Sequence, residues 1–259
     1  MKTFEFFKYQ GTGNDFIMID DREEIFNLTD HEIIAHLCNR KFGIGADGLI
    51  LIRNHREVDF EMIYYNADGH LTSLCGNGSR CAVMFANQLG LIKDNCRFMT
   101  VEGILEASIE YDLVLLKMPD VKQVEIHANH YFLNTGSPHH ICFIEDIQNY
   151  DVFQEGRKIR NGAPYYEKGA NVNFVKPLSE DKIYVRTYER GVEDETLSCG
   201  TGVTAAALVQ GIKGAKSPIH VKTLGGDLQI RFKKEANNSF SNIYLIGPAE
   251  FVFKGEISA

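Results

Sequence analysis

Two short segments of similar sequence carry most of the information about the fold: Cys75-Gly-Asn-Gly-Ser79 and Cys199-Gly-Thr-Gly-Val203. Each opens a segment with helical periodicity, and these helices are expected to end at Gly90 and Gly214. The segments that follow are also alike, because a strand, a glycine turn and a strand pair come next in the same order. The sequence therefore predicts two duplicated halves, each containing one helix that begins at a cysteine.

The duplication also predicts the domain boundaries. A chain of 259 residues is long enough for two domains, and the join is expected near Pro119–Lys122. We expect an N-terminal half over residues 1–119 that carries Cys75 and is completed by a C-terminal strand at 250–259. A C-terminal half over residues 120–249 carries Cys199. One duplicated half cannot easily supply a closed site, so chemistry is expected in the cleft between the halves.

Short alternating or β-branched runs dominate the remaining sequence and predict strands, so the fold class is α+β. A third helix is expected from Thr29 to about Asn39, because Thr29-Asp-His-Glu32 has the pattern of a capping box. The expected strands are Thr3–Tyr9, Phe16–Asp20, Leu49–Arg53, Phe60–Tyr65, Cys96–Val101, Ile104–Ile109, Leu113–Met118, His140–Ile144, Val172–Val175, Ile183–Tyr188, Ile219–Leu224, Leu228–Phe232 and Ile243–Ile246.

Composition narrows the range of partners. The chain has 27 Lys and Arg against 35 Asp and Glu, so a general affinity for nucleic acid or for an anionic membrane has no electrostatic basis. No apolar run approaches the ~18 residues of a membrane span, and the N-terminus has no signal-peptide pattern. We expect a cytoplasmic protein that acts on a small molecule and contacts neither nucleic acid nor membrane.

The six cysteines are too sparse for a disulfide scaffold, and none forms a CxxC pair. Cys75 and Cys199 differ from the others because both lie at helix N-termini, where N–H groups and the helix dipole stabilise a thiolate. We interpret the other four as packing residues: Cys38, Cys81, Cys96 and Cys142.

The residues after each cysteine suit a carboxylate, because glycines let a ligand approach the N–H groups at the helix start. These N–H groups belong to Gly76, Asn77, Gly200 and Thr201. Two such helix ends facing each other would place a thiol on each face of one α-carbon. A thiolate could then remove a proton on one side while a thiol returned one on the other, as in a two-base racemase.

Two longer motifs carry a family resemblance. The segments 66–81 (NADGHLTSLCGNGSRC) and 188–202 (YERGVEDETLSCGTG) closely resemble the diaminopimelate epimerase family. Shorter matches occur in the same order at Gly11–Phe16, Gly43–Gly48 and Asn171–Phe174. The resemblance implies that each half is a curved, mostly antiparallel sheet around a central helix. It also implies a homodimeric, cofactor-independent epimerase that interconverts LL- and meso-diaminopimelate for lysine and peptidoglycan synthesis.

The resemblance assigns the site residues one by one. It makes Cys75 and Cys199 catalytic, and it places His139 near the thiols, where His139 and Glu189 are expected to influence their pKa. The implied substrate contacts are Asn14, Asn66, Gly76, Asn77, Asn171, Glu189, Arg190, Gly200 and Thr201. Two positions depart from the pattern, since Gly48 and Ser137 stand where many members have Gln and Asn.

The charged pair suits a substrate with an ammonium and a carboxylate at each end. Arg190 can grip a carboxylate with two hydrogen bonds, and Glu189 can bind an ammonium; the alternative is a solvated pair at a strand end. No metal is expected, because the histidines lack acidic or Cys partners at ligand spacing. Asp15, Asp47 and Asp68 are expected to hold loops through Asx-type hydrogen bonds.

Three alternatives remain open. A proline or hydroxyproline racemase with two cysteines would share the fold, but Glu189, Arg190 and the asparagines favour a two-ended substrate. A non-catalytic amino-acid-binding protein would not need a matched acid and base. A redox role through a Cys75–Cys199 disulfide is the third alternative, and we interpret such a disulfide as inactivation.

Overall fold

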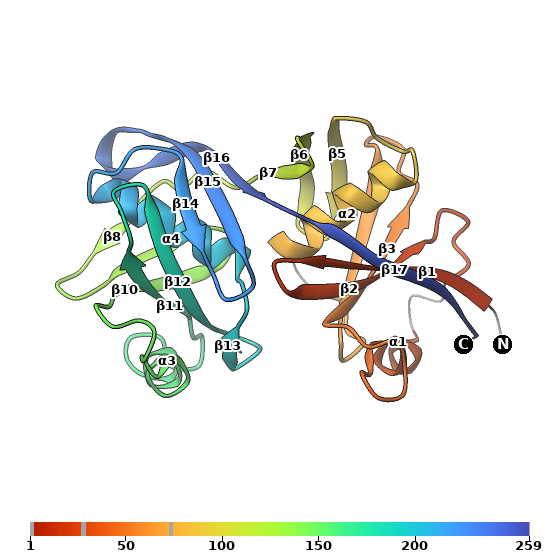
Figure 1. The fold of residues 1–259 in the computed structure, drawn as a ribbon, viewed down its shortest axis with the longest axis horizontal. Coiled ribbons are helices and arrows are strands. Elements are labelled where there is room, and N and C mark those ends of the chain that lie inside the picture. The colour runs from red at the N-terminus through yellow and green to blue at the C-terminus, as the bar shows by residue number, and fades with distance from the viewer. Residues whose placement is uncertain (1–2, 27–29, 73–74, 259) are drawn as a thin grey trace. The chain divides into compact units, whose positions relative to one another are not determined.

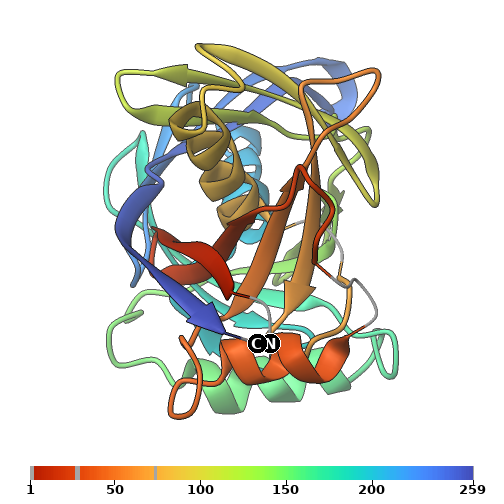
Figure 2. The ribbon, with the colours of Figure 1, turned by 90° about the vertical axis from the view of Figure 1, so that its right-hand side faces the viewer.

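The computed structural model describes residues 3–26, 30–72 and 75–258. The chain divides into two compact units (Figure 1). Unit 1 comprises Met1–Leu116 and Gly247–Ala259, and unit 2 comprises Lys117–Ile246. The end of the chain thus returns to the unit in which the chain begins. There β17 (Glu250–Ser258) pairs antiparallel with β1 (Thr3–Gly11), which places Thr3 opposite Ser258 (Figure 2).

The sheet of unit 1 is mostly antiparallel. Its described strands follow the spatial order β17, β1, β2 (Asn14–Asp20), β3 (Gly48–Arg53), β4 (Phe60–Asn66), β5 (Asn95–Thr100), β6 (Gly103–Glu110) and β7 (Leu113–Lys117). Only the pairs β2–β3 and β4–β5 are parallel within this described set. β3 is an almost continuous apolar run because both of its faces are buried.

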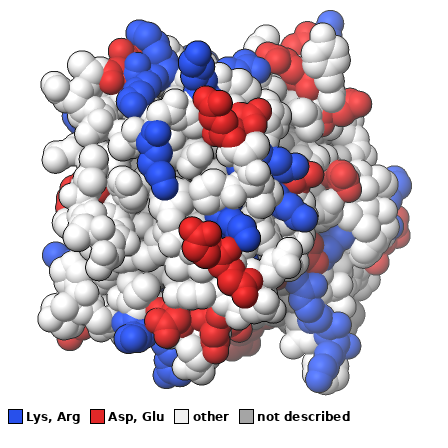
Figure 3. All heavy atoms as spheres, turned by 60° about the vertical axis from the view of Figure 1, so that its left-hand side comes forward, with Lys and Arg blue, Asp and Glu red and all other residues white. Residues whose placement is uncertain are grey.

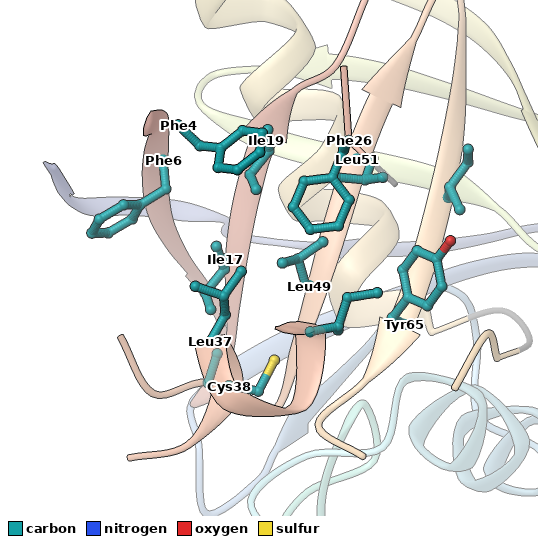
Figure 4. Packing of buried hydrophobic residues seen from close by; sticks show 13 residues of the cluster. Phe4, Phe6, Ile17, Ile19, Phe26, Leu37, Cys38, Leu49, Leu51 and Tyr65 are labelled. Atoms are coloured by element: carbon teal, nitrogen blue, oxygen red, sulfur yellow. The ribbon is translucent and has the colours of Figure 1, made fainter. Parts of the chain in front are cut away.

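Two helices cover the two faces of this sheet. Ile17 and Leu49 lie in one buried cluster with Leu37 of α1 (His31–Cys38) (Figure 4). On the other face Phe16 and Ile50 approach α2 (Gly76–Gln88) at Gly78. Because side chains alternate along a strand, neighbouring residues of β2 and β3 supply both cores.

The sheet curves around α2. This helix packs against β1, β2, β3, β4 and β17. Five strands spaced ~4.8 Å apart are wider than the roughly 10 Å diameter of a helix, so they can all reach it only if the sheet bends. The expected curved sheet around a central helix is therefore confirmed for unit 1.

Unit 2 repeats this arrangement. Its described strands are β8 (Glu125–Ile126), β9 (Tyr131–Asn134), β10 (Pro138–Phe143), β11 (Asn171–Pro177), β12 (Lys182–Glu189), β13 (Asp194–Thr196), β14 (Ile219–Lys222), β15 (Asp227–Lys234) and β16 (Phe240–Gly247). The parallel pairs are β10–β11 and β12–β14, at the places where unit 1 has β2–β3 and β4–β5.

The helices occupy equivalent places as well. α3 (Val152–Asn161) connects β10 to β11 as α1 connects β2 to β3, and α4 (Gly200–Ile212) precedes β14 as α2 precedes β5. α4 packs against β9, β10, β11, β12, β14 and β15. The predicted α+β fold with two duplicated halves is therefore confirmed.

The helix ends follow local sequence signals. Gly90 and Gly214 lie just beyond α2 and α4 with φ of 73° and 110°, so both expected glycine stops are confirmed. The N-cap of α1 is Asp30, whose side chain accepts a hydrogen bond from Ile33 N. The expected start at Thr29 lies outside the described residues.

α3 was not expected from the sequence. Asp151 caps it by accepting a hydrogen bond from Gln154 N at 3.0 Å, but Gly156 and few apolar residues make the segment resemble a loop. A Cβ at Gly156 would lie 2.3 Å from Tyr188 Cβ, so the glycine allows the helix to approach the sheet closely. The short strands β8, β9 and β13 also went unpredicted. In the described residues no helix is long and apolar enough to cross a membrane.

Candidate active site

Cys75 and Cys199 begin α2 and α4 with nearly the same backbone. Their φ and ψ are −113° and 116° for Cys75, and −114° and 110° for Cys199. Ser79 N and Val203 N donate to the two cysteine carbonyls at 2.8 and 2.9 Å. The N–H groups before them therefore point out of each helix end, and both thiols lie where the dipole favours an anion.

In unit 1 the thiol of Cys75 meets Asn14, the first residue of β2. Cys75 Sγ lies 3.4 Å from Asn14 Oδ1 and also 3.4 Å from Gly78 N. Asn14 follows a tight turn in which Thr12 has φ 48° and Gly13 has φ 86°. The fold thus brings the predicted residues Asn14, Cys75, Gly76 and Asn77 to one helix end.

A network of charges holds Asn14 in place. Asn14 Nδ2 donates to Asp47 at 2.6 Å, which turns the amide oxygen toward the thiol. Arg40 donates to both Asp15 and Asp47 at 2.7 Å, and Lys8 pairs with Asp15 at 2.7 Å. Burial alone would raise the pKa of Asp15, but the bonds from Arg40 and Lys8 outweigh it and lower this pKa to about 2.

The three aspartates expected to hold loops do so in different ways. Asp68 forms the expected Asx-type bond, accepting from His70 N at 2.9 Å. Asp15 and Asp47 form ion pairs with Arg40, and each also accepts the backbone N–H of the other, at 3.1 Å for Asp47 N and 3.3 Å for Asp15 N. These ion pairs could not be assigned from the sequence, because Arg40 is distant from Asp15 along the chain.

In unit 2 Asn171, the first residue of β11, connects several predicted site residues. Its Oδ1 accepts from Arg190 N at 2.9 Å, and its Nδ2 donates to Ser137 Oγ at 2.9 Å. Thr135 and Ser137 lie in the turn between β9 and β10. Thr135 Oγ1 donates to Thr201 O at 2.9 Å, so this turn is hydrogen-bonded to the start of α4. Ser137, one of the two departures from the family pattern, is therefore a partner of Asn171.

Glu189 and Arg190 lie at and just after the end of β12. Glu189 Oε2 accepts from Thr196 Oγ1 at 3.0 Å. The exposed Arg190 donates through Nη1 to Lys168 O at 3.0 Å. The guanidinium thus has solvent access and, among the residues that the structure describes, one backbone acceptor, which leaves donors for a ligand.

His139 is completely buried on β10 and is neutral at physiological pH. Burial, aided by the cation of Arg190, lowers the pKa of His139 to about 3. Nδ1 accepts from Asn173 Nδ2 at 3.1 Å, which assigns the ring proton to Nε2. Nε2 has no hydrogen-bond partner among residues 3–26, 30–72 and 75–258. Any influence of His139 on a thiol therefore comes from a neutral N–H dipole.

Asn66 is another predicted contact in unit 1. It lies at the exposed end of β4 opposite Gly48, and its N–H donates to His70 O at 3.0 Å. A Cβ at Gly48 would lie 2.5 Å from Tyr65 O and 2.6 Å from the ring of Tyr64. The glycine that departs from the family pattern therefore accommodates the packing of β4.

Sequence reasoning missed two residues of these helix ends, Asn173 and Arg80. Asn173 bridges three elements, since it bonds His139 on β10, accepts from Thr187 Oγ1 on β12 at 2.9 Å, and faces Gly202 at the start of α4. Its spacing of two from Asn171 places both on one face of β11, which is the signal that could have identified it.

The remaining cysteines are poor nucleophiles. Burial raises the pKa of Cys38 and Cys96 to about 12 and that of Cys142 to about 11. Burial also raises the pKa of Cys81 above its usual range. These four side chains remain thiols at neutral pH, consistent with a packing role.

The histidines of unit 2 stack on one another. The rings of His127 and His130 have centroids 4.3 Å apart, and those of His130 and His140 are 4.2 Å apart. In the described parts of the chain, no group of three His, Cys, Asp or Glu side chains is arranged to hold a metal ion.

Comparison with known proteins supports one family. The family model described as diaminopimelate epimerase matches residues 6–123 and 131–252. A diaminopimelate epimerase of Flavobacterium psychrophilum is 51% identical over 254 residues, covering 97% of this chain and 99% of that protein.

Solved structures of lower identity share the fold. A PhzF-family phenazine biosynthesis protein of Bacillus anthracis superimposes with a TM-score of 0.75 at 15% identity over 100% of both chains. A hydroxyproline epimerase of Agrobacterium vitis, solved with trans-4-hydroxy-L-proline bound, gives a TM-score of 0.70 at 13% identity. That match covers 98% of this chain and 92% of the other.

Proposed function

The chain belongs to the diaminopimelate epimerase family, and on that premise we propose that it interconverts LL- and meso-diaminopimelate without a cofactor. It is an isomerase, and we place it in the synthesis of lysine and of peptidoglycan precursors. The observation that carries the proposal is the pair of cysteines with matching backbone angles at the starts of α2 and α4.

The proposed reaction moves two protons. A thiolate removes the α-proton of the substrate, and the electron pair left on the α-carbon is shared with the adjacent carboxylate. The other thiol then delivers a proton to the opposite face and becomes a thiolate. The N–H groups of Gly76, Asn77, Gly200 and Thr201 are proposed to bind the carboxylate and stabilise the developing charge.

The distant end of the substrate is proposed to bind polar side chains. Arg190 would grip the far carboxylate and Glu189 the far ammonium, with Asn14 and Asn66 as further contacts. Asn171 supports this arrangement by bonding Arg190 N and Ser137 in the ligand-free chain. His139 and Glu189 are proposed to adjust the proton affinity of the thiols.

The alternatives are less well supported. The likeness to the hydroxyproline epimerase is at 13% identity and concerns the fold alone, whereas the relative at 51% identity is a diaminopimelate epimerase. A non-catalytic binding protein is disfavoured because the family consists of epimerases.

A turnover assay on the purified protein tests the proposal. We expect LL-diaminopimelate to be converted to the meso form until both are present, and L-proline and trans-4-hydroxy-L-proline to be left unchanged. Chiral chromatography of the products measures both. Turnover of proline without turnover of diaminopimelate would show that the chain is a racemase of the other type.

Substitution of Arg190 by lysine is expected to lower kcat/KM roughly ten- to a hundredfold. A charge-assisted hydrogen bond is worth about 1.5–3 kcal/mol, and an ammonium cannot reproduce the planar fork of a guanidinium on a carboxylate. Steady-state kinetics with LL-diaminopimelate provide the measurement. Arg157→Lys on the exposed face of α3 is the matched control. Equal kinetics for both variants would mean that Arg190 does not bind substrate.

Activity is expected to survive removal of metals and small cofactors. The thiol pair supplies both acid and base, so the proposed reaction needs neither an electron sink nor a Lewis acid. The measurement is turnover after exhaustive dialysis against a chelator with reductant present. Loss of activity that returns on adding a metal would contradict this expectation.

We propose that the protein is a cytoplasmic homodimer whose ligand is a small molecule. The apolar residues Phe251, Val252 and Phe253 of β17 are 44–53% exposed, which supports burial against a second copy. Lys and Arg are interspersed with Asp and Glu on the face drawn in Figure 3, which offers no extended basic field for nucleic acid. Sedimentation velocity tests the dimer, and a monomer at micromolar concentration would refute it.

A further inference from the structure

The two duplicated helices differ in charge at one equivalent position. Arg80 and Thr204 each lie five residues after the cysteine that begins the helix. Arg80 Nη1 donates to Gly76 O at 3.3 Å, and Thr204 Oγ1 donates to Gly200 O at 2.9 Å. Each side chain thus donates to the equivalent backbone carbonyl of its own helix. A cation lies behind the first cysteine, whereas a neutral hydroxyl lies behind the second.

Arg80 is an unusual cation because it is completely buried among neutral groups. Its guanidinium donates to Thr12 Oγ1 at 3.2 Å and to Pro248 O at 3.2 Å, besides Gly76 O. No ion pair of the described residues includes Arg80. Burial of a charge without an anion is costly, and arginine does not lose its proton. Such a residue is best explained by an anion that forms nearby.

The local geometry is built around this guanidinium. A Cβ at Gly11 would lie 3.3 Å from Arg80 Nη2 and 3.4 Å from Cys81 Sγ. Because glycine has no side chain, β1 can pack closely against the guanidinium of Arg80. Burial lowers the pKa of Arg80, while its electrostatic interaction with Cys81 and Cys75 acts in the opposite direction. The field of the cation therefore reaches both thiols of α2.

Of these two thiols, Cys75 is the one that can become an anion. Cys81 is completely buried, and burial raises its pKa. Cys75 is half-buried at the positive end of α2 and accepts from Gly78 N. The other charges on this side, Asp15 and Asp47, are neutralised by Lys8 and Arg40 through ion pairs.

The start of α4 lacks an equivalent buried cation in the part of the chain that the structure describes. Thr204, Thr135 and Asn173 are neutral, and burial keeps His139 neutral as well. The charged groups proposed for this side are Glu189 at the end of β12 and Arg190 just after it. The carboxylate of Glu189 would disfavour a thiolate, and the exposed side chain of Arg190 is proposed to bind the substrate carboxylate. Solvent screens an exposed charge far more than a buried one.

We propose that Arg80 is a positioning residue that holds the resting protein in one protonation state, with Cys75 as thiolate and Cys199 as thiol. This rests on the two-thiol mechanism proposed above. In that state the substrate α-proton moves to Cys75 Sγ, forming an S–H bond, and the electron pair stays on the α-carbon. Cys199 delivers its proton to the other face and becomes the thiolate. Proton exchange with solvent then restores the resting state.

The test measures thiol reactivity in the free protein, without substrate. The wild-type protein is treated with iodoacetamide across a range of pH, and peptide mass mapping gives the rate at each cysteine. We expect Cys75 to react faster than Cys199 at pH 7. Arg80→Met should lower the Cys75 rate at pH 7 about tenfold and move its midpoint to higher pH, since only the thiolate reacts. The rate at Cys199 should not change.

Arg80→Lys separates charge from structure. Lysine keeps the positive charge but lacks the planar, forked set of N–H donors of arginine. Most of the alkylation rate at Cys75 should therefore remain in this variant. Thr204→Val is the matched control in α4 and should leave the Cys75 rate unchanged. If Arg80→Met does not fold, as judged by near-ultraviolet circular dichroism, Arg80→Gln replaces it, because glutamine retains donors for the neutral acceptors.

Three results would overturn the proposal. They are faster labelling of Cys199 than of Cys75 in the wild type, an unchanged Cys75 rate in the neutral variants, and an equal loss in Arg80→Lys and Arg80→Met. Because no turnover is measured, this outcome is independent of the diaminopimelate assay. If Cys75 is alkylated faster than Cys199 as expected but the protein does not epimerise diaminopimelate, only the proposed function is refuted.

Discussion

Substitution of Cys199 by serine is expected to lower epimerisation at least about a thousandfold, and Cys75→Ser is expected to do the same. A positioned general acid or base contributes roughly 10²–10⁴ in rate, and a serine hydroxyl is far too weak an acid to replace a thiol in either role. The helix end that favours a thiolate cannot compensate, because the alkoxide population stays negligible. The measurement is kcat for both directions of the diaminopimelate reaction.

Cys96→Ala on β5 is the control for loss of a cysteine outside the helix starts. Burial keeps Cys96 a thiol, so this variant should retain wild-type kcat at a temperature where it is folded. An unimpaired Cys199→Ser variant would rule out the two-thiol mechanism.

Solvent deuterium provides a second test of the same pair. With two bases, the proton delivered to the inverted centre comes from a thiol that has exchanged with solvent. Product formed early in deuterated water should therefore carry deuterium, while recovered substrate stays largely unlabelled. Mass spectrometry at low conversion measures both. Equal early labelling of substrate and product would indicate one base that serves both faces.

Substitution of Gly202 by alanine is expected to destabilise unit 2 by about 3 kcal/mol. A Cβ at Gly202 would lie 2.3 Å from Asn173 Oδ1. Asn173 cannot move aside cheaply, since it accepts from Thr187 Oγ1 and donates to His139 Nδ1 inside the buried core. Displacing it would break these bonds and leave polar atoms unsatisfied. Urea unfolding, followed by circular dichroism, measures the change in midpoint.

Gly78→Ala is the matched control, because Gly78 holds the same position in α2. A Cβ there would meet the ends of the Ile50 and Phe16 side chains at 3.1–3.3 Å, and such side chains can adjust by a few tenths of an ångström. Both variants gain the same helix propensity from alanine, so their difference reports the contact with Asn173. Equal stability of the two variants would show that Asn173 is not held as the structure indicates.

The features that depend on local chemistry could be predicted from the amino-acid sequence. Cys75 and Cys199 were identified as helix starts because glycines follow them, and Gly90 and Gly214 as stops because a left-handed residue ends a helix most easily at glycine. The repeated order of helix and strands was enough to predict the duplication and the α+β class. The helix signals lie within a few residues of one another, and the duplication follows from comparing two segments of the sequence, so no tertiary information was needed.

Features that depend on contacts between residues distant in the sequence became visible only in the folded chain. α3 packs closely against Tyr188 through Gly156, and its own segment contains few apolar residues and an internal glycine, so the sequence did not identify it as a helix. Asn14 is held by Asp47, and Asn171 by Ser137, through bonds that span more than thirty residues.

Charge and protonation at the two helix starts were also decided by the fold. In the sequence, Arg80 is one residue of the motif that follows Cys75. Its burial as a cation results from the packing of Thr12 and Pro248 around it. His139 is neutral because the sheet buries it beside Asn173. A pKa depends on the solvent and charges that surround a group, and a linear sequence does not specify them until the chain has folded.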